Sequence, residues 1–198
     1  MNTTPIHATR EEWLLAAIDD LRPLFSVEGH TLPERIRVTC GFPSTASRSG
    51  AIGECFASVA SADSHYELLI SPVLDQPARV FDVLVHELCH TLPGAMNHGA
   101  TFQRAAHAMH LVPTMLRGAQ SWKATGQGAT FAATYGAIIA GLGAYPHAQL
   151  SLGSKKKQTT RLLKAVCPDC GYVIRLTKVH ADKGLPNCSI DGATFRLA

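Results

Sequence analysis

The chain has 198 residues, of which 46% are hydrophobic and 17% are charged, and its formal net charge is +3. This composition predicts a folded protein with one substantial core and room for a small second module, and it excludes collagen-like and largely disordered chains. No apolar run approaches the roughly 20 residues of a membrane-spanning helix, and the apolar stretch 13–18 is too short for a secretory signal. We therefore expect a cytoplasmic protein with no membrane partner.

Charge is distributed unevenly along the chain. Residues 1–153 contain 9 Lys and Arg against 12 Asp and Glu, whereas residues 154–198 contain 9 against 3. A basic C-terminal segment beside a mildly acidic body predicts an anionic partner, of which nucleic acid is the commonest, and a merely solvated tail is the alternative. In addition, no Asp or Glu occurs between Glu87 and Asp169.

In the N-terminal half the sequence pattern predicts a helix followed by a small sheet. Thr9 and the two acidic residues at 11 and 12 are typical of a helix start, and apolar residues then recur at helical spacing until Pro23. Strands are predicted over 35–40, near 55–60 and over 66–70. We expect these strands to form a small antiparallel-type sheet, with Cys40 and Cys55 on segments that could pair as a hairpin.

Two further helices are predicted next. The first is capped by Asp75, has Pro77 in its first turn and runs to about Leu92, and the second begins near His98. Residues 112–153 are less regular, with one helix around 131–139, and the run 153–157 has the composition of a linker. Short strands are expected over 161–166 and 172–176. The predicted class is α+β, with a core over 1–111, a helical or irregular extension over 112–153 that could pack on the core, and a basic module over 154–198.

One motif in the predicted helix carries chemistry, namely His86-Glu87-Leu88-Cys89-His90 with the pattern H-E-x-x-H. Residues four apart lie on one face of a helix, so both imidazoles can reach one cation, and catalytic zinc keeps a position for water. Glu87 can lie close to that water without being a ligand and can take its proton as it attacks a polarised carbonyl. Two surface histidines beside a glutamate are the alternative interpretation.

A third protein ligand has to come from elsewhere in the chain. A glutamate on a later helix is not available nearby, because no acid follows before Asp169, and the metzincin pattern fails because seven residues rather than five separate His90 from the next histidine. What remains is His98, which a helix–turn–helix return can bring back over the face of the first two histidines. Three histidines and a water make a complete catalytic zinc site.

These residues resemble the SprT-like zinc metallopeptidases, the group that contains the DNA–protein crosslink protease Spartan. The resemblance rests on His86-Glu87-x-x-His90, a short turn and His98-Gly99-x-x-Phe102, and it extends to the strand 66–70 and to a C-terminal zinc ribbon as in short bacterial and phage members. It implies a minimal zincin-like core with His86, His90 and His98 as zinc ligands and Glu87 as general base. It also implies proteolysis coupled to DNA binding, as in DNA–protein crosslink repair.

A second group of metal-ligating residues lies near the C-terminus, where Cys167, Cys170 and Cys188 have zinc-ribbon spacing. Without a signal peptide, a metal site is favoured over disulfides. The fourth position holds Asp191, whose carboxylate can bind zinc, and His180 is the rival fourth ligand. A structural zinc would fold a module that has too little core to stand alone. The module would present basic residues to DNA phosphates, namely Lys155, Lys156, Lys157, Arg161, Lys164, Arg175 and Lys178.

The function expected from these patterns is that of a zinc-dependent endopeptidase with a protein substrate associated with DNA, one catalytic zinc and a second, structural zinc. The alternative is a nucleic-acid-binding or regulatory protein whose zincin core is catalytically silent, and another metal-assisted hydrolase is the third hypothesis. Tyr145 or His147 could stabilise the oxyanion, and Asp82 could orient His86.

Overall fold

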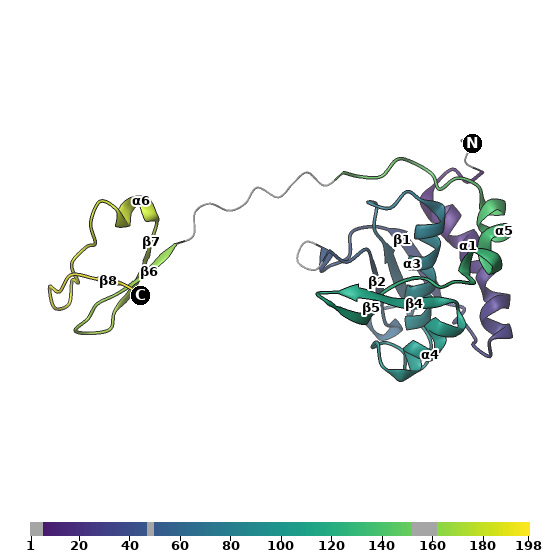
Figure 1. Ribbon diagram of the computed structural model, residues 1–198, viewed down its shortest axis with the longest axis horizontal. Helices are drawn as coiled ribbons and strands as arrows, with labels where there is room; N and C mark the ends of the chain where they lie inside the picture. The colour runs from purple at the N-terminus through teal and green to yellow at the C-terminus, as the bar shows by residue number, and fades with distance from the viewer. Residues whose placement is uncertain (1–5, 47–49, 152–161) are drawn as a thin grey trace. The chain divides into compact units, whose positions relative to one another are not determined.

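The computed structural model describes residues 6–46, 50–151 and 162–198, and the chain divides into two compact units, residues 1–152 and 153–198 (Figure 1). Both units combine helices with strands, so the expected α+β class is confirmed. The predicted linker over 153–157 and the basic residues Lys155, Lys156, Lys157 and Arg161 lie outside the described residues. Among the helices that are described, none is both long enough and apolar enough to cross a bilayer.

The first unit begins with α1 (Arg10–Val27), which starts as the sequence predicts. The Glu12 backbone N–H donates to the Thr9 hydroxyl, and the Glu12 carboxylate accepts from the Thr9 N–H, which completes a capping box. The predicted end at Pro23 is wrong, because the helix continues through this residue. A proline inside a helix costs about 3 kcal/mol. Full burial of Phe25, which lies beyond the proline, contributes about 1.5–3 kcal/mol and offsets much of that cost.

The sheet of the first unit has three strands, β1 (Ile36–Cys40), β2 (Gly53–Phe56) and β3 (Tyr66–Ile70), in the order β1-β3-β2. The expected antiparallel sheet is mixed instead, because β3 pairs antiparallel with β2 but parallel with β1. The buried side chains Leu68 and Ile70 suit β3 to the central position. The expected hairpin between the segments of Cys40 and Cys55 is therefore wrong. The predicted second strand is also shorter than expected, since 58–60 forms the 3-10 helix η1 (Ser58–Ala60).

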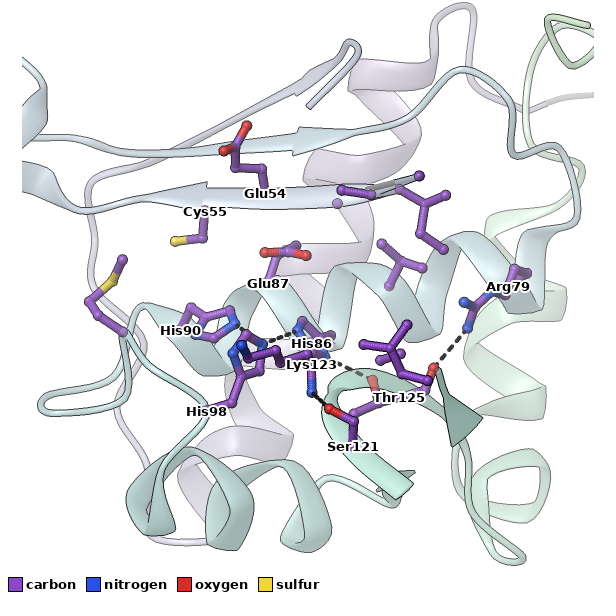
Figure 2. Close-up of a pocket in the computed structure, with 18 of the residues that line it drawn as sticks. Glu54, Cys55, Arg79, His86, Glu87, His90, His98, Ser121, Lys123 and Thr125 are labelled. Carbon is purple, nitrogen blue, oxygen red and sulfur yellow. Dashed lines mark hydrogen bonds between the residues drawn. The ribbon is translucent and has the colours of Figure 1, made fainter. Parts of the chain in front are cut away.

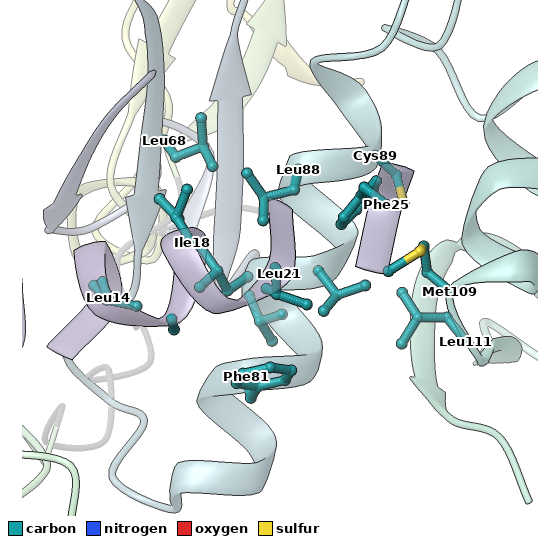
Figure 3. Close-up of a cluster of buried hydrophobic side chains, with 14 of the residues drawn as sticks. Leu14, Ile18, Leu21, Phe25, Leu68, Phe81, Leu88, Cys89, Met109 and Leu111 are labelled. Carbon is teal, nitrogen blue, oxygen red and sulfur yellow. The ribbon is translucent and has the colours of Figure 1, made fainter. Parts of the chain in front are cut away.

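Two helices follow the sheet, α3 (Pro77–His90) and α4 (Ala100–Ala108). The residue before α3 is Gln76, whose side chain makes no capping hydrogen bond, so the predicted cap at Asp75 is wrong. Every residue from Val80 to His90 is buried, which places α3 at the centre of the unit. Its apolar side chains join those of α1 and β3 in one core, which Figure 3 shows with Leu14, Ile18, Leu68, Phe81 and Leu88.

Part of the segment that the sequence left undefined is a hairpin of β4 (Leu111–Leu116) and β5 (Ala119–Gln127). Its turn residues Arg117 and Gly118 have φ values of 52° and 85°, as a two-residue type I′ turn requires. The pairing shifts register after Pro113, so residues 122–124 have no partner in the β4 ladder and form a bulge in β5. Bulges of this kind redirect side chains.

The last element of the first unit is α5 (Phe131–Leu142), which packs on the same core. The Tyr135 ring lies 5.2 Å from the Phe81 ring between centroids. Beyond α5, the buried Arg10 guanidinium donates hydrogen bonds to the carbonyl oxygens of Pro146, at 3.0 Å, and Ala148, at 2.7 Å. The segment after α5 is therefore fixed to the start of α1.

The second unit is a small sheet with long loops. It contains β6 (Leu163–Val166), β7 (Val173–Leu176), α6 (Lys178–Ala181) and β8 (Arg196–Leu197), with antiparallel strands in the order β7-β6-β8. Its described core consists of Ala165, Cys167, Cys188 and Phe195. Two of these four buried residues are cysteines, so the core by itself is small and the cysteines are central to it.

Candidate functional site

Three imidazole nitrogens meet on one side of α3. His98, which lies just before α4, places its Nε2 atom 3.2 Å from Nε2 of His90 and 3.3 Å from Nε2 of His86 (Figure 2). Two nitrogens bound to one zinc at about 2.0–2.1 Å in tetrahedral geometry lie about 3.3 Å apart. The structure thus brings the three histidines together at the spacing of ligands to a single ion, and this group could hold a metal.

Hydrogen bonds orient two of the three rings. Nδ1 of His90 lies 2.8 Å from the carbonyl oxygen of Ala95, which can only accept, so Nδ1 carries the proton and Nε2 presents a lone pair to the cluster. Nδ1 of His86 lies 2.8 Å from the Thr125 hydroxyl on β5. Thr125 is 39 residues away from its partner, and no local pattern pointed to it. Partners of this type fix the ring orientation and the tautomer of metal-binding histidines.

Asp82, which the sequence suggested for orienting His86, has a different role. Its carboxylate pairs with Arg79 and accepts a hydrogen bond at 3.1 Å from the Gln127 side chain on β5. Arg79 also donates to the carbonyl oxygen of Thr125 at 3.2 Å. Asp82 therefore helps to hold the hairpin against α3, and it acts on His86 only through the position of Thr125.

The ring of Phe102 on α4 is a common packing surface for the three imidazoles. Its centroid lies 4.8 Å from His86, 4.3 Å from His90 and 4.9 Å from His98, and it is stacked on the second of these rings. Burial lowers the pKa of each of the three histidines, and it brings that of His98 to about 4. The rings are therefore neutral near pH 7, which is the state that binds a metal.

Glu87 lies between α3 and β2, beside the imidazoles (Figure 2). Burial, together with the charge of Glu54, raises its pKa to about 8. Gly53 on β2 faces this carboxylate: a Cβ atom at position 53 would lie 2.9 Å from Cδ of Glu87 and 2.8 Å from Cγ1 of Val83. The space that Glu87 occupies therefore exists because position 53 has no side chain, a requirement that the sequence alone did not reveal.

The histidines and Glu87 open onto a cavity of about 810 Å³. One wall is β2 with the residues before it, and the opposite wall is the hairpin, which contributes Arg117, Ser121 and Lys123. Tyr145 and His147, the residues suggested for oxyanion stabilisation, do not line this cavity. Tyr145 is buried with its ring 5.2 Å from that of Trp13, and His147 is an exposed residue with a φ of 66°.

The second cluster lies in the second unit and contains Cys167, Cys170, Cys188 and Asp191, whose ligand atoms all lie within 4.8 Å of one another. The Cys167 Sγ atom is 3.3 Å from the nearer Asp191 carboxylate oxygen, and the other two sulfur atoms are 3.5 Å apart. Hydrogen bonding to Asp191 raises the pKa of the Cys170 thiol above its ordinary value.

Two matching loops explain why Asp191 rather than His180 belongs to this cluster. In one loop the Gly171 N–H donates to the Cys167 carbonyl at 3.1 Å, and in the other the Gly192 N–H donates to the Cys188 carbonyl at 2.8 Å. Both glycines have positive φ, 75° and 81°. The residue before each glycine then occupies the same place, which is Cys170 in the first loop and Asp191 in the second. His180 lies on α6 and is not part of the cluster.

Comparison with known proteins gives no relative for this chain: no protein-family model, no curated protein and no solved structure matches it. The two donor sets, three neutral imidazoles and three thiols with a carboxylate, are both of the types that zinc prefers.

Proposed function

We propose that the chain is a zinc-dependent endopeptidase of the SprT-like type, with a zincin-like first unit and a zinc ribbon as its second unit. The observation that carries this proposal is the convergence of His86, His90 and His98 beside a buried carboxylate, Glu87, at the base of an open cavity. Zinc bound by the three histidines would polarise a carbonyl group and lower the pKa of water.

The protein groups around the cluster have separate tasks. The Thr125 hydroxyl holds the His86 ring, and the Ala95 carbonyl holds the His90 ring. The Phe102 ring packs against the imidazoles and is stacked on His90. Glu87 accepts a proton at its carboxylate from the attacking water and delivers it to the nitrogen of the leaving amine.

The walls of the cavity favour a peptide as the substrate. β2 is an edge strand of its sheet and lines the cavity, so one of its sides is turned toward a molecule that enters. An extended peptide can add to such an edge by main-chain hydrogen bonds. This mode would bring its carbonyl groups past Glu87, which lies next to β2 (Figure 2).

The test is the substitution Glu87→Gln in the full, zinc-loaded chain, with casein as the probe substrate. We expect zinc content to be unchanged and the cleavage rate to fall by roughly 10²–10⁴-fold, because the amide keeps the shape but cannot take the proton. Glu28→Gln at the end of α1 is a matched control and should cleave casein normally. Normal cleavage by the Glu87 variant would refute the mechanism.

We also propose that the second unit binds DNA. Lys164 on β6 and Arg175 on β7 are exposed and directly opposite each other in the sheet. Like charges in this position destabilise a sheet, and a phosphate between them would remove the repulsion. This observation also favours the second candidate function, a nucleic-acid-binding protein with a silent zincin core.

Binding of a DNA duplex, measured by fluorescence anisotropy over a range of salt concentrations, tests this partner. In the double variant Lys164→Gln, Arg175→Gln the slope of log affinity against log salt should decrease by about 2. Arg35→Gln, Arg104→Gln in the first unit makes the same change in net charge and should leave the slope unchanged. DNA binding by a zinc-loaded chain that cleaves no protein would favour the silent core over the endopeptidase.

A further inference from the structure

One ammonium group, that of Lys123, stands in the cavity opposite β2. It belongs to the bulge of β5, and the residues on both sides of it are anchored: Trp122 packs against the core, and Thr125 bonds to His86. The Lys123 backbone N–H also donates to the Ser121 hydroxyl at 3.2 Å. The bulge thus directs the Lys123 side chain toward the imidazoles, as Figure 2 shows.

The ammonium group is close enough to the cluster to affect it electrostatically. Burial is the main cause of the lowered pKa of His98, and the charges of His90 and Lys123 lower it further. In the part of the chain that the structure describes, Lys123 forms no ion pair. The carboxylates that line the cavity, Glu54 and Glu87, belong to β2 and α3 rather than to the hairpin wall.

The sequence explains this lack of a counter-ion. No Asp or Glu occurs between Glu87 and Asp169, so neither α4 nor the hairpin can supply a carboxylate. Lys123 lies beside the three imidazoles and has no acidic partner among the described residues. The hairpin side of the cavity therefore carries a positive charge that no carboxylate balances. A molecule that develops negative charge here would be stabilised.

We propose that Lys123 is a catalytic residue of the endopeptidase, and that its Nζ atom donates a hydrogen bond to the scissile carbonyl oxygen as that oxygen becomes negatively charged. This inference rests on the proposed function. Glu87 lies on the β2 side of the imidazoles and Lys123 on the hairpin side (Figure 2). A peptide carbonyl over the three Nε2 atoms then has a proton acceptor on one side and a cationic donor on the other.

The step is balanced without a further reactant. The water oxygen bonds to the carbonyl carbon while the C=O electron pair moves to the oxygen, and the water proton goes to Glu87. When the tetrahedral species collapses, the C–N bond breaks and the amine leaves with that proton. Lys123 contributes only its N–H donors and neither gains nor loses a bond. It thereby fills the role that the sequence suggested for Tyr145 or His147.

The first experiment measures steady-state cleavage of a fluorescence-quenched peptide taken from a casein site that the wild type cuts. Lys123→Ala should lower kcat by roughly 10²–10³-fold with little change in KM, because the interaction exists only in the transition state. Lys123→Arg, which keeps a cationic donor, should recover part of the loss. Arg104→Ala on the exposed face of α4 is the control and should match the wild type.

The second experiment measures binding and needs no turnover. A phosphinic peptide of the same sequence carries a tetrahedral group with a negative oxygen in place of the scissile bond. Lys123→Ala should weaken its binding by about the factor lost in kcat/KM. Binding of the uncleaved peptide, measured with Glu87→Gln present in both chains, should not change. Zinc content and the thermal transition of Lys123→Ala should equal those of the wild type.

Three outcomes would overturn the proposal. Unchanged kcat and unchanged phosphinic-peptide affinity in Lys123→Ala would exclude a role at the oxyanion. A rise in KM confined to acidic peptides would make Lys123 a specificity residue instead, and a loss of DNA affinity alone would assign it to phosphate binding. If the zinc-loaded wild type cleaves nothing, the proposed function itself fails and Lys123 has no reaction to assist. If the wild type cleaves normally and Lys123→Ala is equally active, only the proposed role of Lys123 is refuted.

Discussion

The two ligand clusters of this chain differ in the number of donors that they offer and in what surrounds them. The histidine cluster has three donors, faces a cavity and lies beside Glu87. The cysteine cluster has four donors, which is the number that a structural zinc site uses. Three donors leave a position for a reacting molecule and four do not, so we interpret the first cluster as a site for chemistry and the second as a site for folding.

The clusters also differ in how their ligands are held. The histidines depend on partners from other elements, namely Thr125 on β5, Phe102 on α4 and the Ala95 carbonyl. The cysteine cluster is built from two short loops of the same shape, each closed by its own glycine. A reactive site thus needs the whole first unit, whereas a structural site can be made from local loops. The following predictions test this contrast.

Metal removal should have the largest effect, and it should be confined to the second unit. That unit has a described core of four residues, and zinc contributes about 10–16 kcal/mol to the folding of comparable small domains. The first unit has an extensive apolar core of its own, which should keep it folded after metal removal. After chelation, hydrogen exchange should therefore show loss of protection over residues 163–197 but not over α1 and α3. Protection of both units would remove the folding role of the cysteine cluster.

Gly53→Ala should abolish most of the proposed endopeptidase activity while leaving the ligands of both clusters in place. The added methyl group would meet the Glu87 carboxylate and the Val83 side chain, so the base would be displaced. We expect roughly a 10²-fold or larger decrease in kcat with casein, within the range attributed to a general base. At Gly41, also next to the sheet, a Cβ atom would only touch Leu69 at 3.6 Å, so Gly41→Ala should be active. Full activity in Gly53→Ala would show that Glu87 tolerates displacement.

Thr125→Val should weaken metal binding at the histidine cluster only. Loss of the hydroxyl frees the His86 ring, and such partners are worth about 10–100-fold in metal affinity. Competition with a chromophoric chelator should show one weakened site and one unchanged site. Thr130→Val removes a similar bond, to His110, away from the cluster and should change neither affinity. Equal weakening at both clusters would contradict their independence.

The smallest effect is expected from Asp82, which holds the hairpin on α3. Burial raises its pKa to about 6 from an ordinary 3.8, so between pH 4 and 6 the folded state binds more protons than the unfolded state. The free energy of unfolding should therefore fall as pH rises through this window, by up to about 1.4 kcal/mol per pH unit.

The pH dependence of Asp82 is best measured as a difference between two chains. The histidines with lowered pKa titrate in the opposite sense over the same range, and their contribution is common to both chains. Urea unfolding should show the stability of the wild type falling relative to that of Asp82→Asn as pH rises from 4 to 6. Asp20→Asn on the exposed face of α1 should run parallel to the wild type. Parallel curves for Asp82→Asn would mean that this carboxyl does not titrate between pH 4 and 6.

The parts of the molecule that could be predicted from the sequence are those specified within a few residues. The α1 cap, the course of α3 and the H-E-x-x-H face depend on local spacing, and the approach of His98 followed from the absence of acids after Glu87. The parts that could not be predicted require pairing between distant segments. The position of β3 between β1 and β2 is one example, and the bond from Thr125 to His86 is another. The undefined segment after residue 112 contained the hairpin, and with it Lys123, which lines the cavity, whereas Tyr145 and His147 do not line it.

The two histidines whose rings are oriented by hydrogen bonds differ in whether a mutation can remove the hydrogen-bond partner. The partner of His90 is the main-chain carbonyl of Ala95, which every amino acid possesses, so substitution at position 95 leaves an acceptor in place. The partner of His86 is the side chain of Thr125, which a single codon change can remove or replace. The orientation of His90 is thus little affected by substitution at the partner position, whereas the orientation of His86 depends on which side chain is present at position 125. Variation at position 125 therefore offers evolution, or an engineer, a means to change the orientation of the His86 ring without altering any of the three histidines.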